Sequence, residues 1–133
     1  MEILQIVFSP TGGTQKVADL LAEEWGKTVC RVDLTEPGPE GRKVVLLPEA
    51  DLALIAVPSY AGRVPAVAAE RLGRIRTGGM KCVLVCVYGN RAYEDTLVEL
   101  QDIAEACGFT VTAAVASIAE HSIMHQYAAG RPD

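Results

Sequence analysis

The chain lacks any hydrophobic run long enough to cross a lipid bilayer. Half of its 133 residues are hydrophobic, but no uninterrupted apolar stretch approaches the roughly 20 residues that a transmembrane helix needs. Glu2 stands where an export signal would carry positive charge. We therefore expect a cytoplasmic protein without a membrane partner. At this length, residues 1–133 are expected to fold around one core as a single domain.

Positive charge is scarce and scattered along the sequence. Twelve lysines and arginines stand against 17 aspartates and glutamates, which gives a formal net charge of −5. Proteins that bind nucleic acid usually gather their basic residues into one patch or stripe. No such stripe occurs here, so a nucleic-acid partner is not expected.

Cysteine spacings typical of metal sites are also missing. The chain has four cysteines, and none of them forms a C-x-x-C pair. Cys82 and Cys86 lie four positions apart in an apolar run, hence on the same face of a strand, where cysteine behaves as a small hydrophobic residue. We expect reduced structural thiols and neither a metal ion nor an iron–sulfur cluster in this segment.

The loop after the first apolar run has neither the lysine of a triphosphate-binding P-loop nor the spaced glycines of a dinucleotide-binding loop. Its sequence is Ser9-Pro10-Thr11-Gly12-Gly13-Thr14, between the run Ile3–Phe8 and a helical stretch Gln15–Trp25. Backbone N–H groups, three hydroxyls and the positive helix end converge there. We interpret it as a cradle for a terminal phosphomonoester, formed by Ser9, Thr11, Gly12, Gly13 and Thr14. The alternative is an ordinary helix start with Thr11 or Thr14 as N-cap.

Apolar runs alternate with helical patterns along the whole chain. The expected strands cover 3–8, 28–32, 52–57, 82–88 and 109–118, and the expected helices cover 15–25, 65–76 and 93–107. Continuous apolar strands separated by helices predict an α/β fold, a doubly wound five-stranded parallel sheet in the order 2-1-3-4-5. Glu120–Ala129 offers at most two further helical turns, so the last helix is expected to be short or missing. This suggests either a piece of a longer chain or a partner that covers the exposed patch.

Three of the expected strands end in loops with distinctive chemistry, and the carboxyl ends of parallel strands lie at one edge. The second and third loops add ten candidate residues: Pro58, Ser59, Tyr60, Ala61, Gly62, Tyr88, Gly89, Asn90, Arg91 and Tyr93. Aromatic residues make up only 5% of the chain, yet three tyrosines fall in these two loops. Two facing tyrosines form a slot for a flat ring. A phosphate cradle beside such a slot predicts a mononucleotide-like ligand.

These three loops resemble the FMN-binding loops of flavodoxins. The chain as a whole is similar to the N-terminal flavodoxin-like domain of anaerobic bacterial flavodoxin–ferredoxin fusion proteins, in Val87–Arg91, Glu120–Ser122 and Gly130–Asp133. The resemblance implies noncovalent FMN that cycles by one-electron steps, with its ring between Tyr60 and Tyr93. It also implies a redox partner protein or an iron–sulfur domain of the same longer chain. A dimer stays open.

Two other functions share this topology. An FMN-dependent NAD(P)H reductase of the same fold is the alternative to an electron carrier. A receiver-like signalling domain would need an acidic cluster after the first strand and an aspartate after the third. Phe8-Ser9-Pro10 and Pro58-Ser59 supply neither.

Two features depart from the flavodoxin pattern. In flavodoxins a glycine or another small residue next to the first aromatic allows a peptide flip toward the reduced flavin. Here Ala61 holds that place, and glycine comes one position later. We further hypothesise that Arg63 and Arg91 make the flavin rim locally positive, although both could instead face solvent or pair with Glu94 and Glu70.

Overall fold

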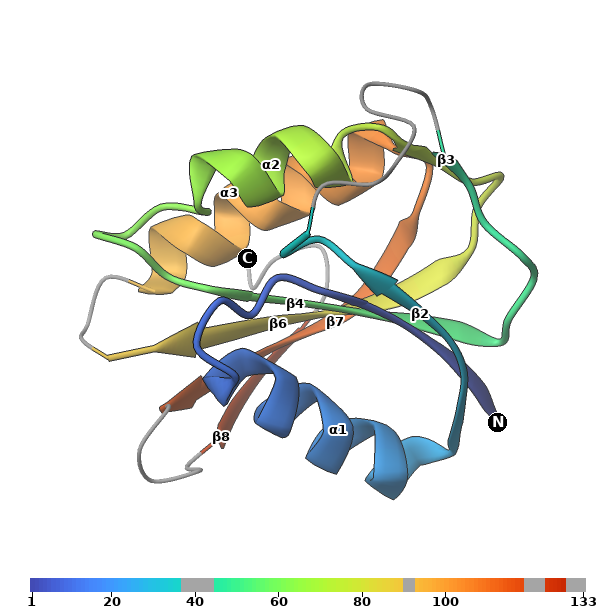
Figure 1. The fold of residues 1–133 in the computed structure, drawn as a ribbon, viewed down its shortest axis with the longest axis horizontal. Helices are drawn as coiled ribbons and strands as arrows, with labels where there is room; N and C mark the ends of the chain where they lie inside the picture. Colours follow the sequence, from blue (N-terminus) through green and yellow to red (C-terminus); the bar gives the residue numbers. More distant parts are fainter. Residues whose placement is uncertain (37–44, 90–92, 119–123, 129–133) are drawn as a thin grey trace.

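A central six-stranded sheet carries helices on both of its faces (Figure 1). The computed structural model describes residues 1–36, 45–89, 93–118 and 124–128, and of Tyr93 and 124–128 it describes only the backbone. The sheet consists of β1 (Glu2–Val7), β2 (Lys27–Asp33), β4 (Leu52–Pro58), β6 (Lys81–Tyr88), β7 (Thr110–Ile118) and β8 (Met124–Ala128). The helices are α1 (Gly13–Trp25), α2 (Ala66–Leu72) and α3 (Tyr93–Ala106). Two short strands, β3 (Val45–Leu46) and β5 (Ile75–Arg76), pair beside the main sheet.

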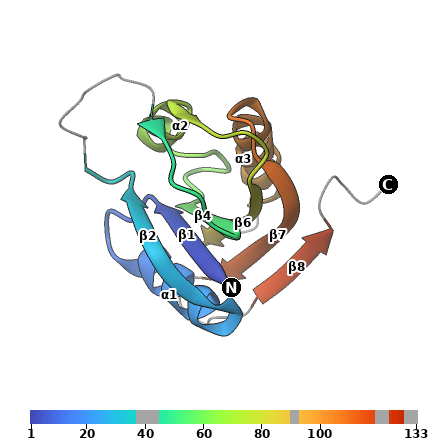
Figure 2. The same cartoon turned by 90° about the vertical axis from the view of Figure 1, so that its right-hand side faces the viewer.

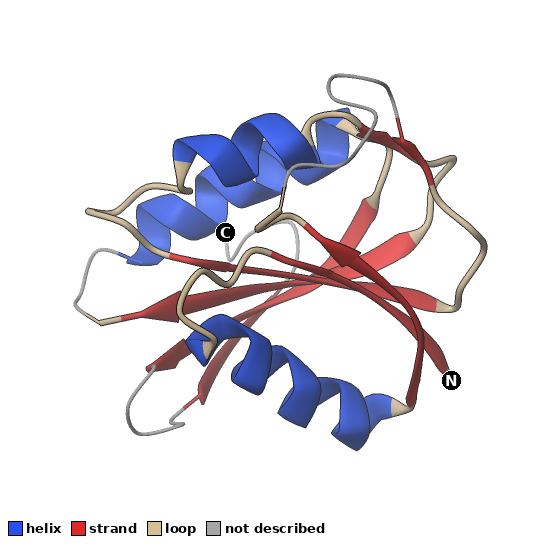
Figure 3. Ribbon diagram, in the orientation of Figure 1, coloured by secondary structure: helices blue, strands red, loops and turns tan. Residues whose placement is uncertain are grey.

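The strand order is β2-β1-β4-β6-β7-β8, and the first five strands are all parallel. This confirms the predicted doubly wound sheet, because the order reverses at β1 as the 2-1-3-4-5 pattern requires. Helix α1 covers one face, and α2 and α3 cover the other (Figure 3). The crossover connections thus lie on both sides of the sheet.

The end of the described chain differs from the expected helical turns. Residues Met124–Ala128 form β8, which pairs antiparallel with β7 from Ser117↔Met124 to Ala113↔Ala128 (Figure 2). The last helix is thus missing from the described residues, in line with the expectation that it is short or missing, and a strand takes the place of the helical turns that the pattern offered. The other residues of Glu120–Ala129 lie outside the described part of the chain. The free edge of β7 offers a row of backbone donors and acceptors, and pairing with the returning chain satisfies them.

The second predicted helix is shorter than its sequence pattern suggested. Helix α2 ends at Leu72, and the chain leaves it at Gly73. Ile75 and Arg76, predicted as the end of that helix, instead pair with β3 as strand β5. A tertiary partner thus overrides the local helical pattern at these two positions.

Both faces of the central strands are buried, which accounts for their unbroken apolar sequences. Alternate residues of β1, β4 and β6 join either a core under α1 or a larger core under α2 and α3. Cys82 and Cys86 both face the larger core, as predicted, and burial raises the pKa of each thiol to about 12. Such thiols stay protonated and unreactive at neutral pH.

Within the described residues, none of the helices combines the length and the apolarity that a membrane crossing requires.

Gly108 ends α3 in a conformation that other residues disfavour, with φ at 101°. A Cβ at this position would overlap the carbonyl oxygen of Thr77. We expect Gly108→Ala to lower the free energy of unfolding by about 1–3 kcal/mol, measured by urea denaturation. Gly78→Ala is the matched control, since a Cβ there meets nothing within 4 Å. Equal stability of the two variants would contradict the tight Gly108–Thr77 contact.

Candidate functional site

The loops that follow β1, β4 and β6 lie at one edge of the sheet, on the left of Figure 1. The arrangement follows from the topology, because these three neighbouring strands are parallel. In open α/β sheets, ligands bind beyond the carboxyl ends of the strands, next to the point where the strand order reverses. The structure thus brings the described parts of the three predicted loops to the expected edge.

The first loop leaves the start of α1 open to an anion. Gly12 is the N-cap residue with φ at 89° and has no side chain that could cap the helix, so the only side-chain acceptor in this turn is the Ser9 hydroxyl, which takes the Gln15 N–H within the described residues. Within the described residues, the N–H groups of Thr11, Gly12, Gly13 and Thr14 have no hydrogen-bond acceptor. The first turn of α1 also has no acidic side chain. A threonine N-cap, the alternative interpretation of this loop, is therefore wrong.

Space above the loop is free as well. A Cβ built on Gly12 or Gly13 would meet no atom within 4 Å. Thr11 is exposed, whereas Thr14 is buried under the helix start. The helix dipole adds partial positive charge at the same point. Unmade N–H donors, open space and a positive helix end together suit a phosphate group without any basic side chain.

Ser9 organises the loop through its own backbone and side chain. Its hydroxyl oxygen accepts the N–H of Gln15 at 3.0 Å. Its N–H donates in turn to the hydroxyl oxygen of Thr35, at 2.7 Å, on the segment after β2. Ser9 was predicted as a phosphate ligand, and in the structure it fixes the first turn of α1. Its role toward a phosphate stays a prediction.

A polar network under α1 escaped the sequence interpretation. Gln5, only 1% exposed, donates to Asp19 at 3.2 Å and to Thr28 at 2.9 Å, and it accepts from Gln15 at 2.8 Å. Burial opposes ionisation of Asp19, but hydrogen bonds from Arg31, Gln5 and Gln15 outweigh it and lower the pKa of that carboxyl. The signal was a lone glutamine inside the apolar run. The network ties α1 to β1 and β2 through Gln15 and Asp19.

The second loop is a tight hairpin turn. Tyr60 and Arg63 exchange both backbone hydrogen bonds, each at 2.9 Å. The two central residues have positive φ, 52° for Ala61 and 80° for Gly62, as a type I′ turn requires. For alanine this conformation costs about 1–2 kcal/mol. Tyr60 is 49% exposed, so its ring is available to a ligand at the sheet edge.

Helix α3 holds this turn through two side chains. The Glu99 carboxylate accepts from Arg63 Nε at 2.9 Å, from Arg63 Nη2 at 3.1 Å and from the Val64 N–H at 2.9 Å. The hydroxyls of Ser59 and Thr96 lie 2.7 Å apart and share a hydrogen bond. The Arg63 hydrogen bond lowers the pKa of Glu99 against the opposing effect of burial, and the Val64 N–H adds to it.

This pairing corrects one part of the charge hypothesis. Arg63 neither faces solvent unpaired nor binds Glu70, which pairs with Arg74 instead. Its positive charge is balanced by Glu99, so Arg63 does not make the loop edge positive. Arg91, the other arginine of that hypothesis, lies outside the described residues.

The third loop is described only in part. Tyr88, the last residue of β6, is 8% exposed and belongs to the core under α2 and α3, so its ring is not an open stacking surface. Gly89 is exposed at the strand end, and Pro58 occupies the equivalent end of β4. Asn90 lies outside the described residues. Tyr93 begins α3, and the placement of its ring stays a prediction.

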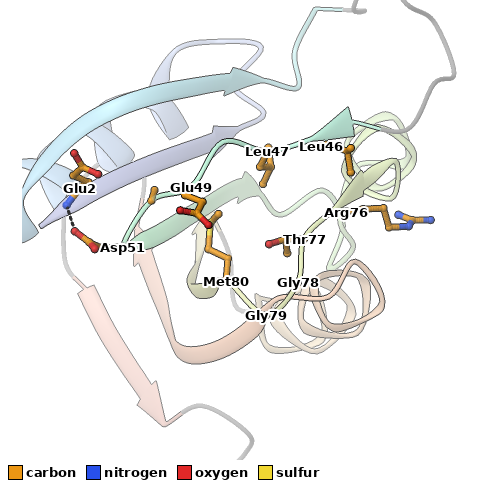
Figure 4. A pocket seen from close by; sticks show the side chains of 11 residues that line it. Glu2, Leu46, Leu47, Glu49, Asp51, Arg76, Thr77, Gly78, Gly79 and Met80 are labelled. Atoms are coloured by element: carbon orange, nitrogen blue, oxygen red, sulfur yellow. Dashed lines mark hydrogen bonds between the residues drawn. The ribbon is translucent and has the colours of Figure 1, made fainter.

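A surface hollow of about 700 Å³ lies at the opposite edge, by the amino ends of β1, β4 and β6 (Figure 4). It contains none of the predicted site residues; its lining is Glu2, Leu46, Leu47, Glu49, Ala50, Asp51, Arg76, Thr77, Gly78, Gly79 and Met80. Asp51 accepts the N–H of Glu2 at 2.7 Å there, which joins the beginnings of β1 and β4. We assign the hollow no part in the predicted site.

The fold matches that of solved flavoproteins at low sequence identity. A flavodoxin from Streptococcus pneumoniae superposes with a TM-score of 0.63 at 17% identity, over 89% of this chain and 84% of that one. An NADH:FMN oxidoreductase superposes with a TM-score of 0.67 at 16% identity, over 89% and 75%. A Fusobacterium nucleatum flavodoxin variant bound to flavin mononucleotide gives 0.59 at 17% identity, over 84% and 68%.

No protein-family model matches the chain, and no curated protein matches it significantly. The likeness to the solved structures therefore establishes the flavodoxin-like fold. Function has to be argued from the residues at the sheet edge.

The Glu99 contact predicts a pH-dependent contribution to stability. Because its pKa is lowered in the folded chain, the stabilisation is complete above the ordinary glutamate value of 4.5 and is lost as the pH falls through the lowered pKa. We expect Glu99→Gln to unfold at lower denaturant than the parent chain at pH 7. The gap should be small, since Arg63 is largely exposed, and should close at acid pH.

Asp102→Asn is the control, because it removes an exposed carboxylate of the same helix that forms no ion pair with the described residues. A gap between Glu99→Gln and the parent chain that persists unchanged at acid pH would contradict the ion-pair assignment.

Proposed function

We propose that this chain binds FMN noncovalently at the carboxyl edge of its sheet and serves as an electron-transfer protein or module. The observation that carries the proposal is the row of unpartnered N–H groups from Thr11 to Thr14 at the open start of α1. The hairpin that presents Tyr60 lies at the same edge of the sheet. The fold shared with an FMN-bound flavodoxin supports the same ligand.

The described residues fit the phosphate of FMN. A phosphomonoester carries three acceptor oxygens, and the loop offers neutral backbone donors together with the hydroxyls of Thr11 and Thr14. The absence of an acidic side chain in the first turn of α1 removes a source of repulsion. We propose that Gly12 and Gly13 admit the phosphate because their missing Cβ atoms leave its approach open.

The flavin ring is proposed to stack on Tyr60 and, from the other side, on Tyr93. The backbone of Ser59–Gly62 and of Gly89–Asn90 would then address the polar edge of the ring. Bound FMN supplies the redox chemistry, while the chain's residues bind, orient and shield it. Helix α3 contributes by fixing the hairpin through Glu99 and Thr96. We propose a redox protein, or an iron–sulfur domain of the same longer chain, as partner.

A reductase that takes hydride from NAD(P)H remains the second candidate, because an NADH:FMN oxidoreductase is among the structural neighbours. The two functions differ in one direct observation. Anaerobic addition of NADPH or NADH to the FMN-loaded chain should leave the flavin absorbance unchanged for a carrier. Bleaching of the flavin within minutes would favour the reductase.

The Tyr60 ring is proposed to contribute stacking energy to FMN binding. Adding FMN to the purified chain should perturb the flavin absorption bands and quench its emission, with micromolar or tighter affinity. We expect Tyr60→Ala to weaken FMN binding by about 1–3 kcal/mol, as for aromatic stacking on nucleobases. Tyr60→Phe keeps the ring and should bind nearly as the parent chain does.

Val67→Ala is the matched control for loss of a surface side chain, since Val67 is 46% exposed on the neighbouring helix. FMN affinity that is the same in the parent chain, Tyr60→Ala and Val67→Ala would place the ring elsewhere.

The residue at the first central position of the Tyr60–Arg63 turn should affect the reduction potential of bound FMN. Flipping the peptide between Ala61 and Gly62 would convert a type I′ into a type II′ turn, whose first central position requires glycine. Ala61 therefore disfavours the flip. We expect Ala61→Gly to allow it and to offer a carbonyl acceptor to reduced flavin, which raises the potential of the first reduction by about 40 mV per hydrogen bond of 1 kcal/mol. Spectroscopic redox titration of both proteins measures the shift, and identical potentials would contradict this assignment.

A further inference from the structure

The start of the first loop, at Ser9, is held by residues that lie outside all three predicted loops. The ladder between β1 and β2 ends at the pair Val7↔Asp33, after which the Leu34 N–H donates to the Val7 carbonyl at 2.8 Å. Two residues beyond Val7, the Ser9 N–H has a side-chain acceptor, the Thr35 hydroxyl oxygen, at 2.7 Å. The Thr35 side chain thus extends the attachment of β1 to β2 into the loop itself.

Thr35 is fixed in turn from two sides. Its own N–H donates to the Asp33 carboxylate at 2.8 Å, which closes a local turn at the end of β2. From the other side, the Arg71 Nη1 of helix α2 donates to the Leu34 carbonyl at 2.7 Å and to the Thr35 carbonyl at 2.8 Å. Arg71 is partly buried at these contacts, so its guanidinium is anchored and not merely near the surface. A charged donor on two carbonyls makes strong hydrogen bonds.

These contacts form a continuous chain from α2 to the first turn of α1. Arg71 holds the Leu34–Thr35 backbone, Thr35 holds the Ser9 N–H, and the Ser9 hydroxyl accepts the Gln15 N–H. We infer that Thr35 and Arg71 are positioning residues for phosphate binding, which set the direction of the open N–H groups of residues 11–14 without touching the ligand. This inference rests on the proposed FMN function and names the residues that make its phosphate site rigid.

A positioning role predicts a selective effect. Preformed donors bind more tightly because no conformational freedom is lost on binding. Loosening Ser9 should therefore weaken recognition of the phosphate and leave the contacts of the ring unchanged. Riboflavin has the same ring and lacks the phosphate, so it separates the two contributions.

The test compares FMN and riboflavin affinities of the parent chain, Thr35→Val, Thr35→Ser and the control Thr110→Val. The control makes the same chemical change at an exposed residue at the start of β7, the far end of the sheet. We expect Thr35→Val to raise the Kd for FMN about three- to tenfold, the worth of one hydrogen bond, with riboflavin binding unchanged. Thr35→Ser keeps the acceptor and should restore FMN binding.

Arg71→Met should cause the same FMN-selective loss. Because Arg71 acts through Thr35, the double variant should bind FMN no more weakly than Thr35→Val alone, whereas the losses from two independent effects would multiply. Affinity losses that multiply in the double variant, or losses that are equal for FMN and riboflavin, would overturn the inference that Arg71 acts through Thr35.

Hydrogen exchange of the Ser9 amide in the ligand-free chain gives a readout that needs no flavin. The amide should exchange at least about tenfold faster in Thr35→Val than in the parent chain or Thr35→Ser, since its acceptor is removed. Unchanged protection of Ser9 would overturn the inference even if FMN binds well. A parent chain that binds neither flavin, with Ser9 protected through Thr35 as described, would instead overturn the proposed function.

Discussion

The proposed phosphate site depends on backbone N–H groups at the start of α1 that have no acceptor within the described residues. Helix N-termini normally satisfy part of their free N–H groups with a capping side chain. Here the N-cap residue Gly12 has no side chain, Ser9 accepts only the Gln15 N–H, and the first turn offers no carboxylate. A site of this kind would attract an anion through neutral donors and the helix dipole alone. Its selectivity must then come from geometry, which explains why so many contacts around it serve to hold backbone in place.

Those contacts come from elements that are distant in sequence. Gln5 and its partners fix α1 from behind, and Thr35 holds Ser9 from the segment after β2. On the opposite side of the sheet, Glu99 of α3 braces the hairpin through Arg63 and Val64. The topology brings the loops to one edge, and these side chains determine how each loop is presented there. Rigid loops on a rigid scaffold favour binding of a preformed ligand such as a cofactor.

Much of this arrangement could be predicted from the sequence, because strands buried on both faces leave unbroken apolar runs such as Leu52–Val57. The edge that carries the loops then follows from topology. Two features could not be read in this way. Strand β8 forms because β7 has a free edge, and nothing local distinguishes its five residues from a short helix. The sequence offered several carboxylates as partners of Arg63, Glu94 and Glu70 among them. Only the packing of α3 beside the turn selects Glu99.

The central claim is that the backbone amides at the start of α1 donate hydrogen bonds to the phosphate of FMN. Two-dimensional ¹H–¹⁵N NMR of the labelled chain tests it most directly, with FMN and riboflavin added in turn. The account predicts large shifts of the Gly12, Gly13 and Thr14 amides with FMN, and much smaller ones with riboflavin. Tight binding of FMN that leaves these three amides at their free positions would contradict the account.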